Sequence, residues 1–307
     1  MSFRDPFDRF PGALVLDGGL ATELERRGAD LRDPLWSAKV LIDEPERIVV
    51  VHRAYLDAGA DVVITGSYQA SFEGLHARGI EGAAADDVFA RSVTLAREAV
   101  GDGLALVAAS LGPYGAMLAN GAEYTGDYGL GNDDAARPIL RDFHRRRAEA
   151  LAAAEPDLLA IETIPSGVEV EALVHMLEDV GDLPAWLSFS CRDDRALHDG
   201  TPIEDAVRLA AASPHVVAVG VNCTAPAHVP ALLRHAARRT AKPLVAYPNR
   251  GATWDATTKS WTGDALPKGF GPLALDLRAA GARLIGGCCG STPSDIAAVA
   301  GALRPAA

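Results

Sequence analysis

Eight short apolar runs alternate with alanine-rich helical stretches along almost the whole chain. Each run is rich in β-branched residues or leucine and ends in polar or glycine-rich residues. The runs are ALVLDGG (13–19), DVVITGSY (61–68), LALVAASLGP (104–113), LLAIETIP (158–165), AWLSFSC (185–191), VVAVGVNC (216–223), PLVAYPN (243–249) and RLIGGCC (283–289). Strands and helices in this order form parallel βα units, and eight such units close a (βα)8 barrel.

The residue patterns favour this barrel over a doubly wound sheet. The runs are apolar throughout, as parallel strands buried on both faces require. The stretches between them repeat apolar residues every three or four positions, which is the spacing of an amphipathic outer helix. No low-complexity linker or run of charges divides the 307 residues. We therefore predict an α/β fold, a single-domain (βα)8 TIM barrel over residues 1–307.

The charge balance excludes several classes of partner. The chain has 41 acidic and 29 basic side chains, a formal charge of −12, which opposes binding to nucleic acid or to an anionic membrane. No apolar run is long enough to cross a bilayer, and the first residues lack the basic segment and apolar core of a secretory signal. We expect a cytoplasmic protein that acts on small molecules, with no nucleic-acid or membrane partner.

All four cysteines follow predicted strands, where the reactive groups of a TIM barrel lie. Two of them are adjacent, which does not suggest a disulfide framework. Cys191 has no glycines around it, so we expect it to be a packing residue. Cys223 ends the sixth strand, whereas Cys288 and Cys289 end the eighth. These three should therefore be neighbours, with only one strand between them.

The glycines around the adjacent pair allow both cysteines to serve one site. Consecutive strand residues point to opposite faces, so the backbone must leave the strand conformation at Cys288 and Cys289. Gly286, Gly287 and Gly290 permit this, because glycine reaches positive φ without a Cβ clash. Three thiolates and an open position are typical of a catalytic zinc site. A phosphate site in this turn and a strained redox disulfide are the alternatives.

Other chemistries find less support in the sequence. None of the four lysines ends a strand, which argues against a Schiff-base aldolase. No histidine ends a strand either, which argues against a histidine-ligated hydrolase, and we expect His52, His144, His175 and His235 on helix surfaces. No convincing glycine-rich dinucleotide fingerprint is present.

Nine stretches match the motifs of one family of barrel enzymes. They are LDGGLATELERRG, SYQAS, SLGPYGAMLANGAEYTGDY, IETIP, SFSCRD, DGTPI, VGVNCTAP, YPN and GGCCGSTP. GGCCG together with the earlier NC is the most specific of them. From about residue 13 to residue 303 the chain resembles the homocysteine S-methyltransferases, zinc-dependent enzymes that make methionine. The resemblance implies that Cys223, Cys288 and Cys289 bind Zn²⁺.

The same resemblance implies roles at the ends of the first and fourth strands. DGG and IETIP are similar to the parts of the family that hold homocysteine, so Asp17, Gly18 and Gly19 would approach its head group and Glu162 would bind its ammonium. A carboxylate can pair with an ammonium, and backbone N–H groups can receive a carboxylate. A salt bridge in the barrel mouth is the alternative for Glu162, and a helix or turn cap for Asp17.

Four long segments after strands are candidate active-site loops: 20–44, 68–83, 111–135 and 249–270. The stretch GPYGAMLANGAEYTGDY is most similar to the branch that uses S-methylmethionine or S-adenosylmethionine as methyl donor. A sulfonium is a cation and binds to aromatic faces or carboxylates. Trp36 is our first choice for a donor contact, and Tyr114 is a second. Tyr68, Tyr124 and Tyr128 lie in the same loops.

Two other functions remain compatible with these residues. The zinc end is shared with betaine-using homocysteine methyltransferases, so the donor could be betaine. A non-catalytic zinc or thiol-sensing barrel would use oxidation of Cys288 and Cys289 as its switch. The sequence does not indicate the oligomeric state.

Overall fold

The eight predicted strands form one parallel barrel. The computed structural model describes residues 6–251, 253–255, 260–262, 266 and 268–304. The strands are β1 (Leu14–Val15), β2 (Val62–Ile64), β3 (Leu106–Leu111), β4 (Leu158–Ile164), β5 (Ala185–Phe189), β6 (Val216–Asn222), β7 (Leu244–Tyr247) and β10 (Ala282–Ile285). They pair in the order β1-β10-β7-β6-β5-β4-β3-β2, and a parallel bridge from Leu16 to Val62 joins the two ends. The predicted (βα)8 barrel is confirmed.

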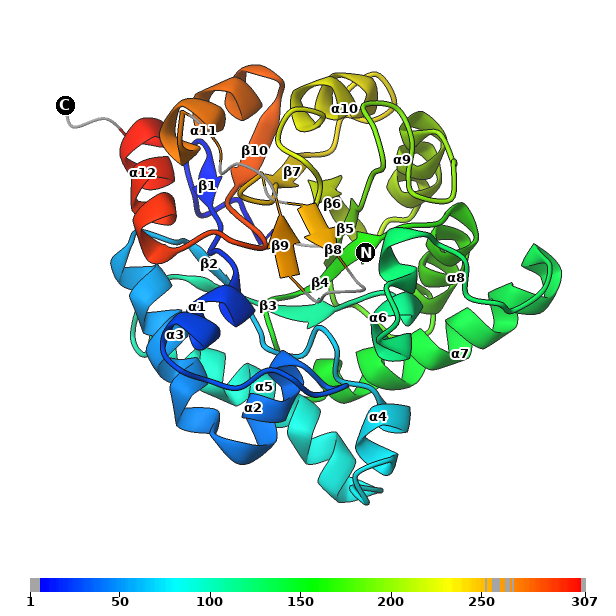
Figure 1. Cartoon of the computed structure of the whole chain (residues 1–307). Helices are drawn as coiled ribbons and strands as arrows, with labels where there is room; N and C mark the ends of the chain where they lie inside the picture. Colours follow the sequence, from blue (N-terminus) through cyan, green and yellow to red (C-terminus); the bar gives the residue numbers. More distant parts are fainter. Residues whose placement is uncertain (1–5, 252, 256–259, 263–265, 267, 305–307) are drawn as a thin grey trace.

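An outer ring of helices surrounds the strands (Figure 1). The main helices are α3 (Pro45–Asp57), α5 (Ala83–Val100), α7 (Asp133–Ala152), α8 (Gly167–Leu177), α9 (Ile203–Ala212), α10 (Val229–Ala236), α11 (Phe270–Ala279) and α12 (Pro293–Leu303). Side-chain caps begin several of them, because the first N–H groups of a helix lack internal partners. Asn132 caps α7, Ser166 caps α8, and Thr292 with Asp295 forms a capping box on α12.

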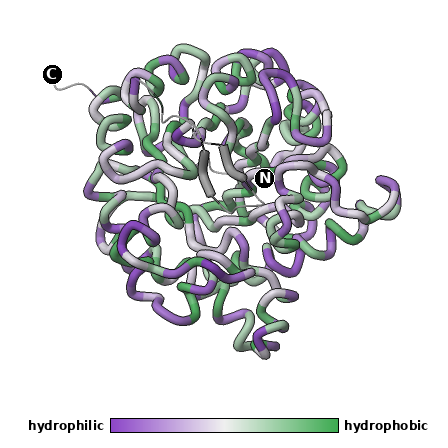
Figure 2. Tube along the Cα trace, in the orientation of Figure 1, coloured by the Kyte–Doolittle hydropathy of each residue, from purple (hydrophilic) through white to green (hydrophobic). Residues whose placement is uncertain are grey.

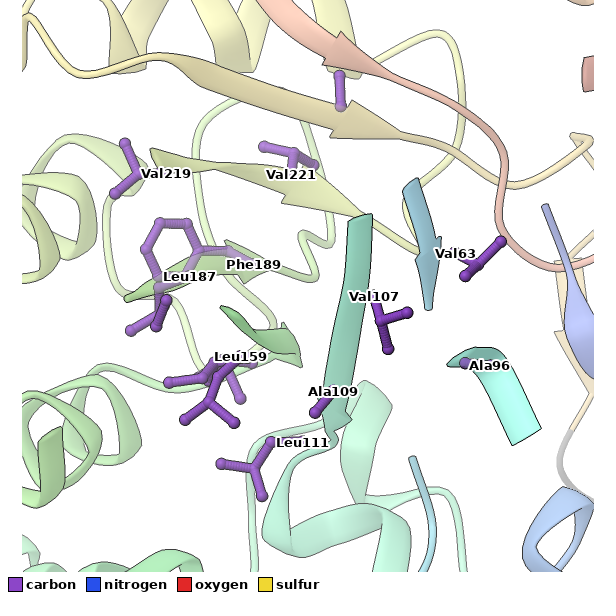
Figure 3. Packing of buried hydrophobic residues seen from close by; sticks show 14 of the residues in the cluster. Val63, Ala96, Val107, Ala109, Leu111, Leu159, Leu187, Phe189, Val219 and Val221 are labelled. Atoms are coloured by element: carbon purple, nitrogen blue, oxygen red, sulfur yellow. The ribbon is translucent and has the colours of Figure 1, made fainter. Parts of the chain in front are cut away.

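Alternate residues of each strand face opposite sides of the barrel wall. On β3, Leu106 and Ala108 belong to the cluster inside the barrel, whereas Val107, Ala109 and Leu111 pack in the larger cluster that includes the helices. Figure 3 labels part of the larger cluster, including Val63, Leu159, Leu187, Val219 and Val221. Figure 2 shows hydrophobic and hydrophilic colours alternating along the outer helices, with many hydrophilic stretches at the periphery. Burial on both faces explains why the strands are apolar throughout.

Three of the four predicted loops carry short helices. Segment 20–44 contains α1 (Leu20–Arg26) and α2 (Ser37–Asp43), segment 68–83 contains α4 (Phe72–His76), and segment 111–135 contains α6 (Tyr114–Leu118) and the 3-10 helix η1 (Ala122–Tyr124). Within 249–270 an antiparallel hairpin pairs β8 (Thr253–Asp255) with β9 (Ser260–Thr262), and Figure 1 draws it across the centre of the barrel. Residues 252, 256–259, 263–265 and 267 of that segment lie outside the described residues.

Two histidines differ from their predicted positions. His52 on α3 and His144 on α7 are fully buried rather than on the helix surface. His144 Nε2 lies 2.8 Å from Glu169 Oε1, whereas neither ring nitrogen of His52 has a partner within the described part of the chain. The helices pack against their neighbours as well as the barrel, so a single polar residue in an amphipathic pattern does not mark the exposed face. Across the described residues, no helix is both long and apolar enough to span a bilayer.

Candidate metal and substrate site

Three cysteine thiols meet at the carboxyl ends of the strands. Cys223 Sγ and Cys288 Sγ each lie 3.9 Å from Cys289 Sγ, and the three sulfurs are all within 4.8 Å of one another. A tetrahedron with Zn–S bonds of about 2.3 Å separates its sulfurs by about 3.8 Å. The thiols can therefore hold a metal ion and leave one position for a substrate atom. Cys191 is buried in the apolar core instead, and burial raises the pKa of its thiol.

A strained backbone aims the first of these thiols. Cys223 follows β6 directly and has φ 46°, a left-handed conformation that is uncommon for a residue with a Cβ. Thr163 on β4 is also left-handed, with φ 64°. Asn222 joins the two: its Oδ1 accepts a hydrogen bond from Thr163 N at 2.7 Å, and its Nδ2 donates to Thr163 Oγ1 at 2.8 Å. Such strain persists where surrounding contacts fix it, and Asn222 supplies two of them.

The glycines beside the cysteine pair act differently from one another. Gly290 has φ 80°, as the sequence predicted for this turn. Gly286 and Gly287 are not at positive φ and are required by close packing. A Cβ on Gly286 would lie 2.6 Å from Leu16 Cβ, and one on Gly287 would collide with Ser291 Oγ. Because glycine has no side chain, the end of β10 can approach the end of β1.

The three thiols differ in acidity. Hydrogen bonds from the thiols of Cys288 and Cys289 hold the pKa of Cys223 well below its usual value, with further contributions from Tyr124 and Asn249. The Tyr124 hydroxyl lies 3.6 Å from Cys223 Sγ. The pKa values of Cys288 and Cys289 are raised, because their thiol protons hydrogen-bond to Cys223. Their thiolates would also be buried next to the charge of Cys223. Cys223 is thus the first thiolate of the group.

The end of β1 is tied to the cysteine turn. Gly19 N donates to Ser291 Oγ at 3.0 Å, and Ser291 Oγ donates to the Cys288 carbonyl at 2.6 Å. A Cβ on Gly18 would lie 2.8 Å from Ser291 Oγ, so this approach also requires glycine. Asp17 is 1% exposed, and its Oδ2 accepts a hydrogen bond from Ile64 N at 2.8 Å. Its Oδ1 has no partner among the described residues.

Glu162 is a second buried carboxylate at the mouth. It is 6% exposed, and its Oε1 accepts a hydrogen bond from Ser110 Oγ at 2.5 Å. Burial raises its pKa to about 7, against the effect of hydrogen bonds from Ser110 and Tyr247. The structure gives Glu162 no cationic partner within the described ranges, and its charge adds to the burial that raises the pKa of Asp17. Two buried carboxylates without a counter-ion favour a cationic ligand between them.

The predicted aromatic contacts lie in different places. Trp36 packs edge-on against Tyr68 with ring centroids 6.2 Å apart. Burial raises the pKa of Tyr68, and the charges of Glu123 and then Cys223 raise it further. Tyr114 packs 4.9 Å from Phe143 of α7 instead. The structure therefore brings Tyr124, and not Tyr114, to the thiols.

Several residues of the site lie within the stretches that match the family, but the sequence alone assigned them no individual role. Ser110 and Tyr247 bond Glu162, Asn222 positions Cys223, and Glu123 precedes Tyr124. Their signal is position, because Ser110, Asn222 and Tyr247 lie at or near the carboxyl ends of strands, where a barrel places its site. Glu123 does not end a strand, but it lies within the loop stretch GPYGAMLANGAEYTGDY that resembles the sulfonium-using branch.

Comparisons with known proteins agree with this geometry. A family model described as homocysteine S-methyltransferase matches residues 14–303. Homocysteine S-methyltransferase YbgG of Bacillus subtilis is 43% identical over 304 residues, which cover 95% of each chain. Homocysteine S-methyltransferase of Escherichia coli is 47% identical over 303 residues, covering 93% of this chain and 94% of that one. The metallated crystal structure of the Escherichia coli homocysteine methyltransferase MmuM superimposes with a TM-score of 0.84 at 44% identity, over 96% of this chain and 99% of that chain. The chain belongs to the homocysteine S-methyltransferase family.

Proposed function

We propose that this chain is a zinc-dependent homocysteine S-methyltransferase that transfers a methyl group from a sulfonium donor, S-methylmethionine or S-adenosylmethionine, to form methionine. The observation that carries this function is a three-thiol group with an open position, near two buried carboxylates that have no cationic partner among the described residues. Zinc suits three thiolate ligands, and the sulfur spacing suits its tetrahedral geometry. Residues 1–307 would act as one homocysteine-binding barrel domain, in the cytoplasm and on small molecules.

The proposed roles follow from the positions of the side chains. Cys223, Cys288 and Cys289 would hold the zinc, which would keep the homocysteine thiol deprotonated at neutral pH. Asp17 Oδ1 and Glu162 would bind the homocysteine ammonium, because both carboxylates lack a cation within the described residues. Gly18 and Gly19 would let the head group approach, although the Gly19 N–H is already bonded to Ser291.

Methyl transfer then needs positioning more than acid–base chemistry. The homocysteine sulfur forms a bond to the methyl carbon while the carbon–sulfur bond of the donor breaks. The electrons of the broken bond stay with the donor sulfur, which leaves as a neutral thioether. Trp36, beside Tyr68, is proposed to contact the donor. Tyr114 packs on α7 and would affect the donor only through the loop that carries it.

Metal analysis and a donor assay test this function. We expect one zinc per chain in the reduced protein and methionine formation from homocysteine with a sulfonium donor. A chelator should abolish the activity, and added zinc should restore it. Full metal occupancy in a Cys288→Ser, Cys289→Ser double variant would exclude the proposed ligands. Activity with betaine alone would identify a betaine-type enzyme, and zinc binding without methyl transfer would favour a thiol sensor.

A further inference from the structure

A third carboxylate, that of Glu123, lies next to Tyr124 in the sequence and has one oxygen without a hydrogen-bond partner among the described residues. Glu123 lies in η1, in the loop after β3, and its Oε2 is buried with no hydrogen-bond partner among the described residues. None of the ion pairs seen across those residues includes Glu123 either. Burial raises the pKa of Glu123 to about 7, and the charge of Cys223 adds to the effect. Burying an unpaired carboxylate costs free energy that a bound cation would recover.

The position of Glu123 relative to the thiols follows from its neighbours. The next residue, Tyr124, places its hydroxyl 3.6 Å from Cys223 Sγ. Burial raises the pKa of Tyr68, and the charges of Glu123 and Cys223 raise it further, so this ring lies near both groups. Trp36 packs edge-on against Tyr68. Glu123 and the rings of Tyr68 and Tyr124 therefore lie near Cys223.

We propose that Glu123 binds the sulfonium cation of the methyl donor, with the rings of Tyr68 and Tyr124 beside it. The inference rests on the proposed methyl transfer, and it adds a specificity-determining residue for the donor. A cation in this position gains from the carboxylate and from the aromatic faces together. The thiolate of homocysteine and the three cysteinates outweigh the charge of zinc, so the surroundings also favour a cation.

The homocysteine ammonium and the sulfonium of the donor would bind to different carboxylates. Asp17 follows β1, Glu162 lies within β4, and the two carboxylates interact with each other, which suits the homocysteine ammonium. Glu123 is on a separate loop, on the side of the thiols where Tyr124 lies. When the methyl group leaves, the donor sulfur takes both electrons of the broken bond and loses its positive charge. The attraction to Glu123 then disappears, so this carboxylate should strengthen donor binding and not hold the thioether product.

Steady-state kinetics with Glu123→Gln test the proposal. The variant keeps the size of the side chain and removes its charge. Glu178→Gln is the matched control, because Glu178 is exposed at the end of α8 and its replacement changes the net charge equally. We expect the KM for S-methylmethionine to rise by roughly thirtyfold in Glu123→Gln. The KM for homocysteine and the zinc content should stay within about twofold of the parent. An unchanged donor KM would overturn the inference.

Direct binding separates the sulfonium from the donor ammonium and from the chemistry. Trimethylsulfonium has no amino group, so calorimetry with the zinc-loaded protein measures the sulfonium contact alone. The affinity should fall in Glu123→Gln but not in Glu178→Gln, and Glu123→Asp should retain part of it. Equal affinity for parent and Glu123→Gln would overturn the assignment even if the donor KM changed, because Glu123 would then bind the ammonium. A parent protein that binds trimethylsulfonium through Glu123 but transfers no methyl group would refute the proposed function alone.

Discussion

Replacing Glu162 by glutamine should weaken homocysteine use while the metal site stays intact. Glutamine keeps the shape of the side chain and can still accept the hydrogen bond from Ser110, which is 2.5 Å from Glu162 Oε1 in the parent. The substitution removes the negative charge that we propose for the homocysteine ammonium. The cysteines follow other strands, β6 and β10, so zinc content should not change.

The size of the effect follows from burial. Glu162 is 6% exposed, so water screens its interaction with a bound ammonium only weakly. A hydrogen bond to a charged group in such a place is worth about 2 to 3 kcal/mol. At 1.36 kcal/mol for each factor of ten, this corresponds to a loss of roughly 30- to 150-fold in kcat/KM for homocysteine.

The assay compares two thiol substrates with each protein. Homocysteine has the ammonium, whereas 3-mercaptopropionate does not. With saturating S-methylmethionine, parent and Glu162→Gln should use 3-mercaptopropionate almost equally, while homocysteine use falls in the variant. Zinc is measured in the same preparations. An equal loss toward both thiols would show that Glu162 supports the fold or the metal ligands, and the proposed ammonium contact would be wrong.

Two further substitutions test the packing residues. Cys191→Ala should keep full zinc content and activity, because Cys191 is buried in the apolar core; loss of metal from a folded variant would show a different ligand set. His52→Leu should become more stable relative to the parent as the pH falls. Burial lowers the pKa of His52 from 6.5 to about 4, so the unfolded chain binds more protons than the folded one between these values, and the parent loses stability on acidification. From pH 8 to pH 5, the unfolding free energy of His52→Leu minus that of the parent should increase by about 2 kcal/mol in urea titrations. An equal gap at both pH values would mean that His52 does not stay neutral in the fold.

The barrel could be predicted because its signal is local. Parallel strands buried on both faces give continuous apolar runs, and outer helices repeat with their own period. Each of the eight runs contains a strand, although β1 covers only Leu14–Val15. The hairpin of β8 and β9 was missed, since such short strands add little pattern to a long loop. His52 and His144 were placed on the surface, because the pattern of one helix does not show which neighbours cover it.

The sequence by itself determined which thiols come together. NC and GGCCG follow strands, and strand ends meet in any barrel of this kind, so Cys223, Cys288 and Cys289 had to be neighbours. The sequence also indicates that glycine is needed in this turn, but the structural reason differs between positions. Gly290 has a positive φ, whereas a side chain on Gly286 would collide with Leu16.

Only the tertiary structure decided what surrounds the three thiols. Gly19 bonds Ser291 across 272 residues of sequence, and Tyr124 reaches Cys223 across 99. No local period encodes such contacts, because they arise when the ends of the barrel close and the loops fold over its mouth. The same closure leaves Glu123 Oε2 buried without a hydrogen-bond partner among the described residues, which the local pattern of its loop does not show.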